Sequence, residues 1–433
     1  MITNSYSSKK NKKQRIYFTV FSFIILPFFH TILAQDANKY TLIPDINFEN
    51  ALRDSGYDHG VPDGKVLTAD IAKVTELHLR NRDIKDLTGI NDFVSLRKLI
   101  CLENKLTKLD LSDNLALTTL NCEENKLTIL NISRNEALIS LNCSNNRITA
   151  LDLKQSVKLT SLSCDRNQLD ELDVSKNISL RELRCGKNKL TSLDISRNIV
   201  LANFYCNTNQ LKALDLSHNI NLMSFGCSEN QITDIDLSAN LYLSNFSCSN
   251  NPLNKLDLTH NIYLSYLVCM NTPLTNLDLS KNIALNKAYL DENKLNSLDV
   301  SKNINLTYLS CYKNQLVKLN VANAPLNELV CYSNKLVALD VSQNPLLLSL
   351  TCSNNQLVSL DISQNPKIYA LYCNSNSLTS LNISNGNNQN LNFHAYFNPN
   401  LKCIQTDKDI VPHFNWRKDG IANYSSNCKL ITY

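Results

Sequence analysis

Thirteen cysteines recur at a nearly constant interval of 21 residues, and their thiols could in principle act as nucleophiles or metal ligands. The column consists of Cys101, Cys122, Cys143, Cys164, Cys185, Cys206, Cys227, Cys248, Cys269, Cys311, Cys331, Cys352 and Cys373. Zinc sites need paired cysteines or nearby histidines, whereas each interval here supplies one cysteine and no histidine beside it. Leu290 occupies the same position once, so an aliphatic side chain is accepted there. The pattern therefore predicts buried free thiols that fill a core.

A second column, of aspartates, could bind calcium. It contains Asp110, Asp152, Asp173, Asp194, Asp215, Asp236, Asp257, Asp278, Asp299, Asp340 and Asp361, with asparagine at Asn131, Asn320 and Asn382. Because asparagine replaces aspartate freely and the glycine-rich nonapeptide of calcium-binding β-rolls is missing, we interpret these residues as acceptors of hydrogen bonds in turns. The loop "DSGYDHGVPDG", with Asp54, Asp58 and Asp63, is another calcium candidate, but it lacks EF-hand spacing and a plain turn is favoured. We therefore predict no metal and no cofactor.

The remaining chemistry-bearing residues do not form a catalytic pattern. The histidines that follow the N-terminal segment are His59, His78, His218, His260, His394 and His413. None has a nucleophile or carboxylate at a telling spacing, so we predict that the protein is not an enzyme. The chain has only eight glycines and contains neither GxGxxG nor GxxxxGK[ST], which argues against a phosphate-binding loop.

The N-terminus carries a targeting segment. Five basic residues up to Arg15 precede the apolar run Ile16 to Leu33, and Ala34 provides a small residue for cleavage, so residues 1–34 are predicted to be a secretory signal peptide. An uncleaved anchor is the alternative. Removing five basic and no acidic residues changes the formal charge from +4 to −1, which argues against nucleic acid as a partner. No later segment is apolar enough to cross a membrane, so none is expected after cleavage.

The two columns belong to one repeat of the form L-x-x-L-x-C-x-x-N-x-L-x-x-L-D-[LIV]-S-x-N-x-x. Fourteen such units run from Leu96 to about Asn388, a less regular unit starts at Val74, and a half unit starts at Leu391. This is a leucine-rich repeat, and it resembles the 21-residue bacterial class sometimes called IRREKO, in which cysteine can replace a leucine. The resemblance implies a β-rich solenoid, a superhelix of about 15 coils with a parallel β-sheet.

Each conserved column has a physical role in such a coil. The alternation in L-x-x-L-x-C predicts a short strand with Leu99 and Cys101 inward and Ile100 and Leu102 outward. Asn104 and its equivalents occupy the ninth position of every unit except that of Thr272, where a buried amide can bond the backbone as the chain leaves the strand.

Both open ends of a solenoid must be covered, and the flanking segments can cover them. Residues 35–73 are predicted to form an N-terminal cap, with Asp45 as the N-cap of a helix, Phe48 on its apolar face and Gly56 at its end. This segment resembles the helical caps of internalin-like secreted repeat proteins. After the repeats of residues 74–388, residues 389–433 are predicted to form a half repeat and a C-terminal cap, in which Cys403 and Cys428 are disulfide candidates.

Outward strand positions are free of packing constraints, so their composition bears on function. In the N-terminal coils they are mostly small and polar, as at Asn142 and Ser144, whereas from Leu264 onward they turn aromatic. The predicted binding residues are Tyr266, Tyr289, Tyr308, Tyr312, Tyr332 and Tyr372, together with Lys287, Lys313 and Glu328. Asp291 and Ser310 are expected to face outward among them. Exposed tyrosines that merely suit a β surface are the alternative interpretation.

These observations predict a secreted or surface-exposed bacterial protein that binds another protein, or adheres to one, through its strand face. Two alternatives use the same residues differently. Tyrosines beside asparagines could stack on a carbohydrate, and a purely structural role in the cell envelope would need no soluble ligand. A monomer is expected.

Overall fold

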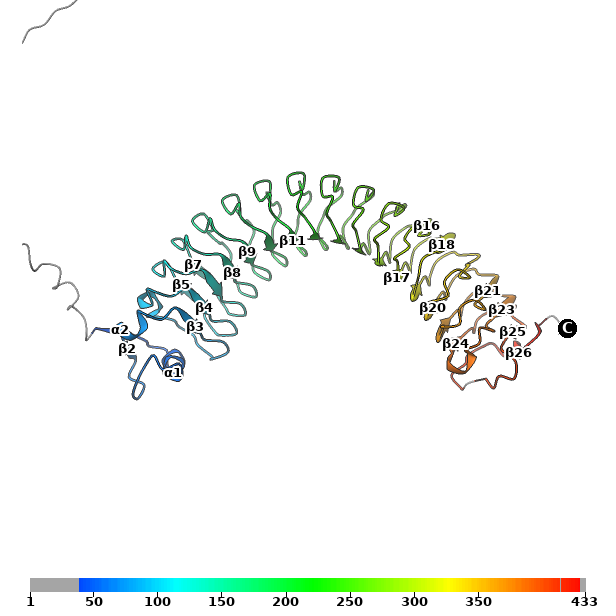
Figure 1. Ribbon diagram of the computed structural model, residues 1–433, viewed down its shortest axis with the longest axis horizontal. Helices are drawn as coiled ribbons and strands as arrows, with labels where there is room; N and C mark the ends of the chain where they lie inside the picture. Colours follow the sequence, from blue (N-terminus) through cyan, green and yellow to red (C-terminus); the bar gives the residue numbers. More distant parts are fainter. Residues whose placement is uncertain (1–38, 413, 429–433) are drawn as a thin grey trace, which may run out of the picture. The chain divides into compact units, whose positions relative to one another are not determined.

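The computed structural model describes residues 39–412 and 414–428, and from Tyr40 onward the chain forms one compact unit. The predicted signal peptide and His413 lie outside the described residues. Within the unit the coils follow one another along an arc, with the main sheet on the inner, concave side (Figure 1). In the part of the chain that the structure describes, no helix has the length and apolar character needed to span a membrane.

The main sheet is parallel, has 16 strands, and takes one three-residue strand from each coil. Its strands are β3 (Glu76–His78), β4 (Lys98–Ile100), β6 (Thr119–Asn121), β8 (Ser140–Asn142), β9 (Ser161–Ser163), β10 (Glu182–Arg184), β11 (Asn203–Tyr205), β12 (Ser224–Gly226), β13 (Asn245–Ser247), β14 (Tyr266–Val268), β15 (Lys287–Tyr289), β17 (Tyr308–Ser310), β19 (Glu328–Val330), β20 (Ser349–Thr351), β22 (Ala370–Tyr372) and β24 (Asn392–His394). Neighbouring strands pair in register, one repeat apart, so equivalent residues stack side by side. The predicted parallel solenoid is confirmed.

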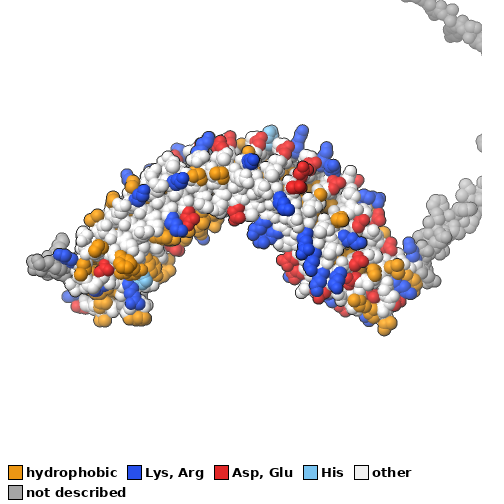
Figure 2. Space-filling view, turned by 180° about the vertical axis from the view of Figure 1, so that it is seen from behind, with side chains coloured by type: hydrophobic (Ala, Val, Ile, Leu, Met, Phe, Trp, Pro, Cys, Tyr) orange, Lys and Arg blue, Asp and Glu red, His pale blue; other side chains and the backbone are white. Residues whose placement is uncertain are grey.

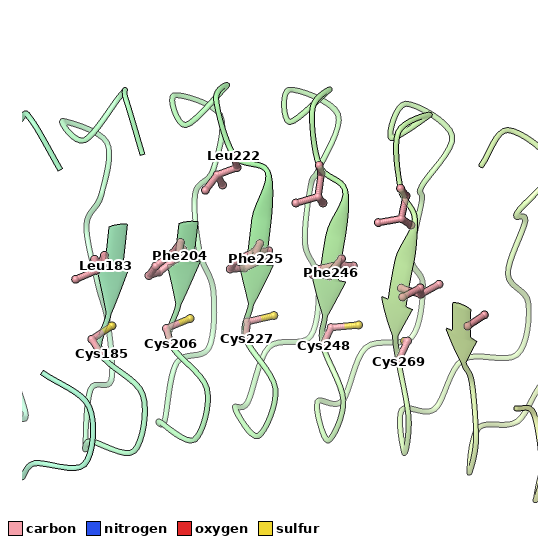
Figure 3. Close-up of a cluster of buried hydrophobic side chains, with 14 of the residues drawn as sticks. Leu183, Cys185, Phe204, Cys206, Leu222, Phe225, Cys227, Phe246, Cys248 and Cys269 are labelled. Carbon is pink, nitrogen blue, oxygen red and sulfur yellow. The ribbon is translucent and has the colours of Figure 1, made fainter. Parts of the chain in front are cut away.

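The interior is built from the conserved apolar columns. Leu96, Leu99 and Cys101 are buried, as are their equivalents in successive coils. Figure 3 shows the cysteines of five successive coils in one row, beside a row of larger side chains at the middle of each strand. Phe204 stacks on Phe225 with ring centroids 5.5 Å apart. Because each coil buries its apolar face against the next, the core is continuous although no single coil could form one.

Buried asparagines tie the coils together where the chain leaves each strand. The Asn125 side-chain amide donates to the carbonyl oxygens of Cys101 (3.0 Å) and Cys122 (3.1 Å), and its Oδ1 accepts from the Leu106 N–H (3.0 Å). The preceding residue in each coil has positive φ, as at Glu124 (φ 52°), which costs a residue with a side chain about 1 kcal/mol or more. These hydrogen bonds offset that strain, so the turn repeats without glycine.

The opposite side of the coils pairs less continuously. Its strands are β5 (Lys108–Asp110) with β7 (Ile129–Asn131), β16 (Ser297–Asp299) with β18 (Lys318–Asn320), and the row β21 (Ser359–Asp361), β23 (Ser380–Asn382), β25 (Cys403–Gln405) and β26 (Asn423–Ser425). The coils between β7 and β16 have no assigned strand on this side. A continuous hydrogen-bonded sheet holds coils close together on one side only, which explains the curvature towards that side.

The N-terminal cap is helical, as predicted. Strand β1 (Tyr40–Leu42) pairs with β2 (Lys65–Leu67), α1 (Ile46–Asp54) lies between them in sequence, and the short helices α2 (Thr68–Ile71) and η1 (Ile90–Asp92) follow. Asp45 caps α1 by accepting from the Asn47 and Phe48 N–H groups, and Gly56 (φ 76°) follows its C-terminus. The Phe48 ring is buried, and its centroid lies 6.2 Å from that of the Phe93 ring. The helix thereby covers the open end of the core.

The C-terminal cap follows the short helix η2 (Asn388–Asn390) and strand β24. Trp416 is buried against Phe393 (ring centroids 5.4 Å) and donates its indole N–H to the Leu391 carbonyl at 2.8 Å. Cys403 and Cys428 form a disulfide with Cα atoms 5.8 Å apart, which confirms the predicted pairing. The tryptophan covers the last coil, and the disulfide ties the end of the described chain to β25.

Candidate binding surface

The cysteine column is chemically quiet. All thirteen of its thiols are buried and free, as predicted. Burial raises the pKa of the Cys101 and Cys143 thiols to about 12, because a thiolate there would lose its hydration. At neutral pH these two thiols are protonated, and like the other thiols of the column they are buried and fill the core.

The aspartate column stabilises turns. The Ser175 N–H donates to Asp173 Oδ1 at 2.9 Å, and the Ser196 N–H donates to Asp194 Oδ1 at 2.9 Å. Hydrogen bonds from the Ser175 hydroxyl and N–H hold the pKa of Asp173 below its usual value. Asn131 accepts the equivalent bond from the Ser133 N–H at 3.2 Å, which explains why an amide can replace the carboxylate. The turn interpretation of this column is confirmed.

The acidic residues of the N-terminal loop make separate contacts. Asp54 pairs with Arg82 (2.6 Å), Asp63 lies 3.6 Å from the Lys65 ammonium, and Asp58 accepts from the His59 N–H. Among the residues that the structure describes, no group of three or more His, Cys, Asp or Glu side chains is placed to hold a metal ion.

The sequence-predicted tyrosines gather on the concave face in two main groups. The name tyrosine strip is used here for Tyr266, Tyr289, Tyr308, Tyr312, Tyr332 and Tyr372. Ring centroids are 5.7 Å apart for Tyr266 and Tyr289 and 4.8 Å apart for Tyr289 and Tyr308, so these rings form one continuous cluster. The Tyr312 and Tyr332 rings are stacked, with centroids 4.6 Å apart and an interplanar angle of 5°. Such contacts hold the rings in place, so little side-chain entropy is lost on binding.

The other predicted residues lie around this centre. Lys313 pairs with Glu292 (2.7 Å) and its ammonium lies 5.8 Å from the Tyr312 ring centroid, whereas Lys287 is exposed. Burial of the Tyr308 ring is the main cause that raises the pKa of Tyr308, and the negative charge of the half-buried Glu328 is the second.

Tyr372 stands apart from the five-tyrosine centre. The coil that contains β20 presents Ser349, Thr351 and Ser353 at the outward positions, which leaves a break in the aromatic surface. The Tyr372 ring packs instead against His394, with centroids 5.1 Å apart. Tyr372 therefore belongs with the aromatic residues near the C-terminal cap.

The expectation that Asp291 and Ser310 face solvent is wrong. Both are only 2 % exposed. Asp291 Oδ1 accepts from the Ser310 hydroxyl (2.5 Å) and from the Tyr312 N–H (3.1 Å), so the carboxylate links two neighbouring coils beneath the tyrosine strip. Burial raises the pKa of Asp291 to about 6, and the two hydrogen bonds only partly offset this rise. Ser144 is also buried, although it was expected to face outward.

Comparison with known proteins places this geometry in a family. No protein-family model matches the sequence, and no curated protein matches it. Among solved structures, the chain is similar to InlJ of Listeria monocytogenes, with 35 % sequence identity over 83 % of this chain and 81 % of that one and a TM-score of 0.76. That structure is described as the functional domain of InlJ and as including a cysteine ladder, which matches the cysteine column. The chain belongs to the internalin-like leucine-rich repeat proteins.

Two more distant structures share the fold of this internalin-like protein. InlF of Listeria monocytogenes is 21 % identical over 78 % of this chain and 91 % of its own, with a TM-score of 0.57. YopM of Yersinia pestis is 24 % identical over 77 % of this chain and 95 % of its own, with a TM-score of 0.61. At these identities the likeness concerns the fold alone. The predicted membership of an internalin-like class is confirmed.

The sequence interpretation missed part of the aromatic surface of this internalin-like protein. Near the cap, His394 lies 5.9 Å from Tyr396, which in turn contacts Phe397 at 5.0 Å. Phe397 is 67 % exposed at a positive φ of 56°, and Asp419 accepts its backbone N–H at 2.9 Å. The signal was present in the half unit "LNFHAYFNPN", in which His394, Tyr396 and Phe397 fall in the outward columns whereas Phe393 is buried.

The charged residues are distributed differently from the aromatic ones. Figure 2 views the unit from behind, so its N-terminal part lies to the right. Lys and Arg side chains gather there, whereas hydrophobic side chains are more frequent towards the C-terminal part on the left. On the face seen in this view the two parts of the internalin-like arc therefore differ in charge, and the coils that carry the tyrosine strip belong to the C-terminal part.

Proposed function

We propose that this protein is a secreted or cell-surface, non-enzymatic bacterial protein that binds a protein partner through its concave face. The observation that carries the proposal is the gathering of five tyrosines in neighbouring coils. They form two clusters, Tyr266 with Tyr289 and Tyr308, and Tyr312 with Tyr332, and ring centroids within each cluster lie 4.6 to 5.7 Å apart. Preorganised tyrosines supply large contact areas at low entropic cost and are enriched in binding hot spots. The N-terminal basic and apolar segment supports secretion, and the fold shared with InlJ supports interaction or adhesion.

Nearby polar groups would add specificity to this surface. Lys287 and Lys313 provide positive charge at its edges, and the Lys313–Glu292 pair is exposed. Contacts of this kind mainly steer association and fix orientation, whereas the buried centre of an interface provides most of the affinity. The partner is therefore a protein surface with apolar side chains at its centre and acidic groups at its rim.

Carbohydrate is the alternative ligand, and the geometry favours it less. A sugar ring stacks on a free aromatic face, but Tyr312 and Tyr332 stack on each other and so occupy their facing surfaces. The Tyr289 and Tyr308 rings are similarly close, at 4.8 Å. A glycan array probed with the purified protein distinguishes the two classes, since a protein-binding strip predicts no glycan signal that depends on these tyrosines.

The test is a variant with Tyr289, Tyr308 and Tyr312 all changed to Ser. Protease digestion of intact cells first checks that the repeats are accessible from outside the cell. A protein captured from extracts of host or neighbouring cells is then identified, and its affinity for the repeat protein is measured with purified components. We expect the triple variant to lose binding by roughly a hundredfold or more, because the loss of hot-spot aromatics costs about 2 kcal/mol or more each.

The matched control changes Tyr40 and Tyr369 to Ser. Both are 53 % exposed and lie outside the tyrosine strip, so binding should be unchanged. The melting temperature of the triple variant should stay within a few degrees of the unmodified protein. Undiminished binding by a folded triple variant would remove the tyrosine strip from consideration.

A further inference from the structure

A row of aliphatic side chains protrudes from the turns that precede the main-sheet strands, at a position to which the repeat consensus assigns no type. The aliphatic row consists of Val157, Ile178, Ile199, Ile220, Leu241, Ile262, Ile283 and Ile304. Each is between 44 and 59 % exposed, and the row continues without a break through eight successive coils. Glu136 occupies the same position in an earlier coil and is exposed, so the fold does not require an apolar residue there.

The residues around the centre of the row enlarge the apolar surface. Tyr242 and Tyr263 directly follow members of the row, stack on each other with centroids 6.3 Å apart, and are about half exposed. Met223, three residues after Ile220, is also exposed. With the eight aliphatic side chains these residues present roughly 600 Å² of apolar surface. A typical monomer exposes a largest patch of about 300–600 Å², and a standard interface buries about 800 Å² per partner.

The basic side chains of the turns lie towards the ends of the row rather than at its centre. Those nearest the middle are Arg197 on one side and Lys281 on the other, with the exposed His218 and His260 between them, while an aspartate borders the row in each coil. Leu241 lies midway, three coils from Ile178 and three from Ile304. An apolar centre with a charged rim is the anatomy of a protein interface, and its symmetry about Leu241 suits an isologous contact.

From this arrangement we infer that two copies of the chain associate through the aliphatic row, in antiparallel orientation, about a two-fold axis at Leu241. A second copy is a partner whose side chains repeat at the same spacing, so the seven row members from Ile178 to Ile304 can face their counterparts in the other copy. Ile178 of one copy then faces Ile304 of the other. The concave face lies outside this contact, so each copy keeps its tyrosine strip free.

An anionic membrane is the less suitable occupant. The aspartates from Asp152 to Asp299 border the row in every coil, and their hydrogen bonds to the turns hold the pKa values of several of them, such as Asp215 and Asp257, below the usual range. They therefore remain ionised at neutral pH and would be repelled by acidic headgroups, which offsets the attraction of the lysines.

Sedimentation velocity over a wide range of protein concentration tests the inference. The unmodified protein should pass from monomer to dimer as its concentration rises, and added salt should not weaken the dimer, because the contact is apolar and its charged ends are alike. The variant with Ile220→Glu and Leu241→Glu should bind its own copy roughly a hundredfold more weakly. The control with Val317→Glu and Val337→Glu, at equally exposed valines outside the row, should dimerise normally.

Cross-linking then tests the orientation. With a short bismaleimide, Leu241→Cys should cross-link to itself, and Ile178→Cys should cross-link to Ile304→Cys in a mixture but not to itself. The native thiols stay silent because they are buried. A protein that remains monomeric at all concentrations, or a Glu variant that dimerises as well as the unmodified protein, overturns the inference. Binding of a monomeric protein to phosphatidylglycerol vesicles through the row also overturns it and assigns the row to a membrane.

Discussion

At the scale of single residues, the outward strand positions carry either side chains that are accessible to a partner or side chains that form hydrogen bonds with the neighbouring coil. Tyr289 and Tyr308 present rings to solvent, whereas Asp291 turns back and accepts two hydrogen bonds. Asn207 plays the same part elsewhere, accepting the Ser228 N–H at 2.8 Å. These side chains satisfy backbone N–H groups at the edge of the sheet. Period-two alternation cannot separate an outward residue that binds a partner from one that bonds the neighbouring coil.

Changing Asp291 to Asn should stabilise the protein at neutral pH. The folded-state pKa of about 6 lies above the ordinary value of 3.8, so the ionised carboxylate destabilises the fold above about pH 6, and this penalty fades as the pH falls towards 4. An amide keeps the acceptor oxygen, as Asn207 shows. We expect a gain of about 2 kcal/mol at pH 7 and little gain at pH 4, measured by urea unfolding. An equal gain at both pH values would contradict the proposed titration.

At the scale of the repeating element, asparagine joins consecutive coils. In the central coils, Asn209 donates to the Cys185 (3.1 Å) and Cys206 (3.0 Å) carbonyls and accepts from the Leu190 N–H (3.1 Å). Each such amide bonds backbone groups of its own coil and of the preceding coil, so it joins the turns that follow neighbouring strands of the main sheet. The sequence predicted this role from the ninth position alone, because a buried polar side chain at a turn must find backbone partners.

Replacing Asn209 with Ala should therefore destabilise the central coils by about 3 kcal/mol, since three hydrogen bonds are lost and buried backbone groups are left unpaired. Hydrogen exchange localises the effect, and it should be confined to the coils around Asn209 because each coil contacts only its neighbours. The exposed neighbour Gln210 changed to Ala is the matched control, with a change below about 0.5 kcal/mol. A similar loss in both variants would argue against the hydrogen-bond account.

At the scale of the whole repeat unit, stability depends on keeping the ends closed. The N-terminal helix α1 buries Phe48 over the first coils, and the C-terminal cap places Trp416 over the last. The Cys403–Cys428 disulfide closes a segment of 25 residues beside that tryptophan. Because coils contact only their neighbours, unfolding is expected to begin at an end whose cap is weakened.

Changing both Cys403 and Cys428 to Ser should weaken the C-terminal end by about 3 kcal/mol. Trp416 is the only tryptophan in the sequence, so its fluorescence should report cap opening at lower urea concentration than the loss of far-UV circular dichroism. A thiol reagent followed by peptide mapping should then label Cys373 and Cys352 before Cys101. Simultaneous labelling of all thirteen column thiols would show instead that the repeats unfold as one cooperative unit.

The sequence by itself determined the coil: the 21-residue period, the inward Leu and Cys columns, the asparagine at each turn, the aspartates that cap the turns and the disulfide of the cap. These features are local or repeat at fixed spacing, so pattern and polarity suffice to assign them. Only the tertiary structure decided the curvature, which depends on how continuously each side of the coils pairs. It also showed that Asp291 is buried beside the tyrosines and that one aliphatic side chain per coil, over eight coils, forms a continuous exposed row. Both depend on which side chains of neighbouring coils meet, and a single repeat does not contain that information.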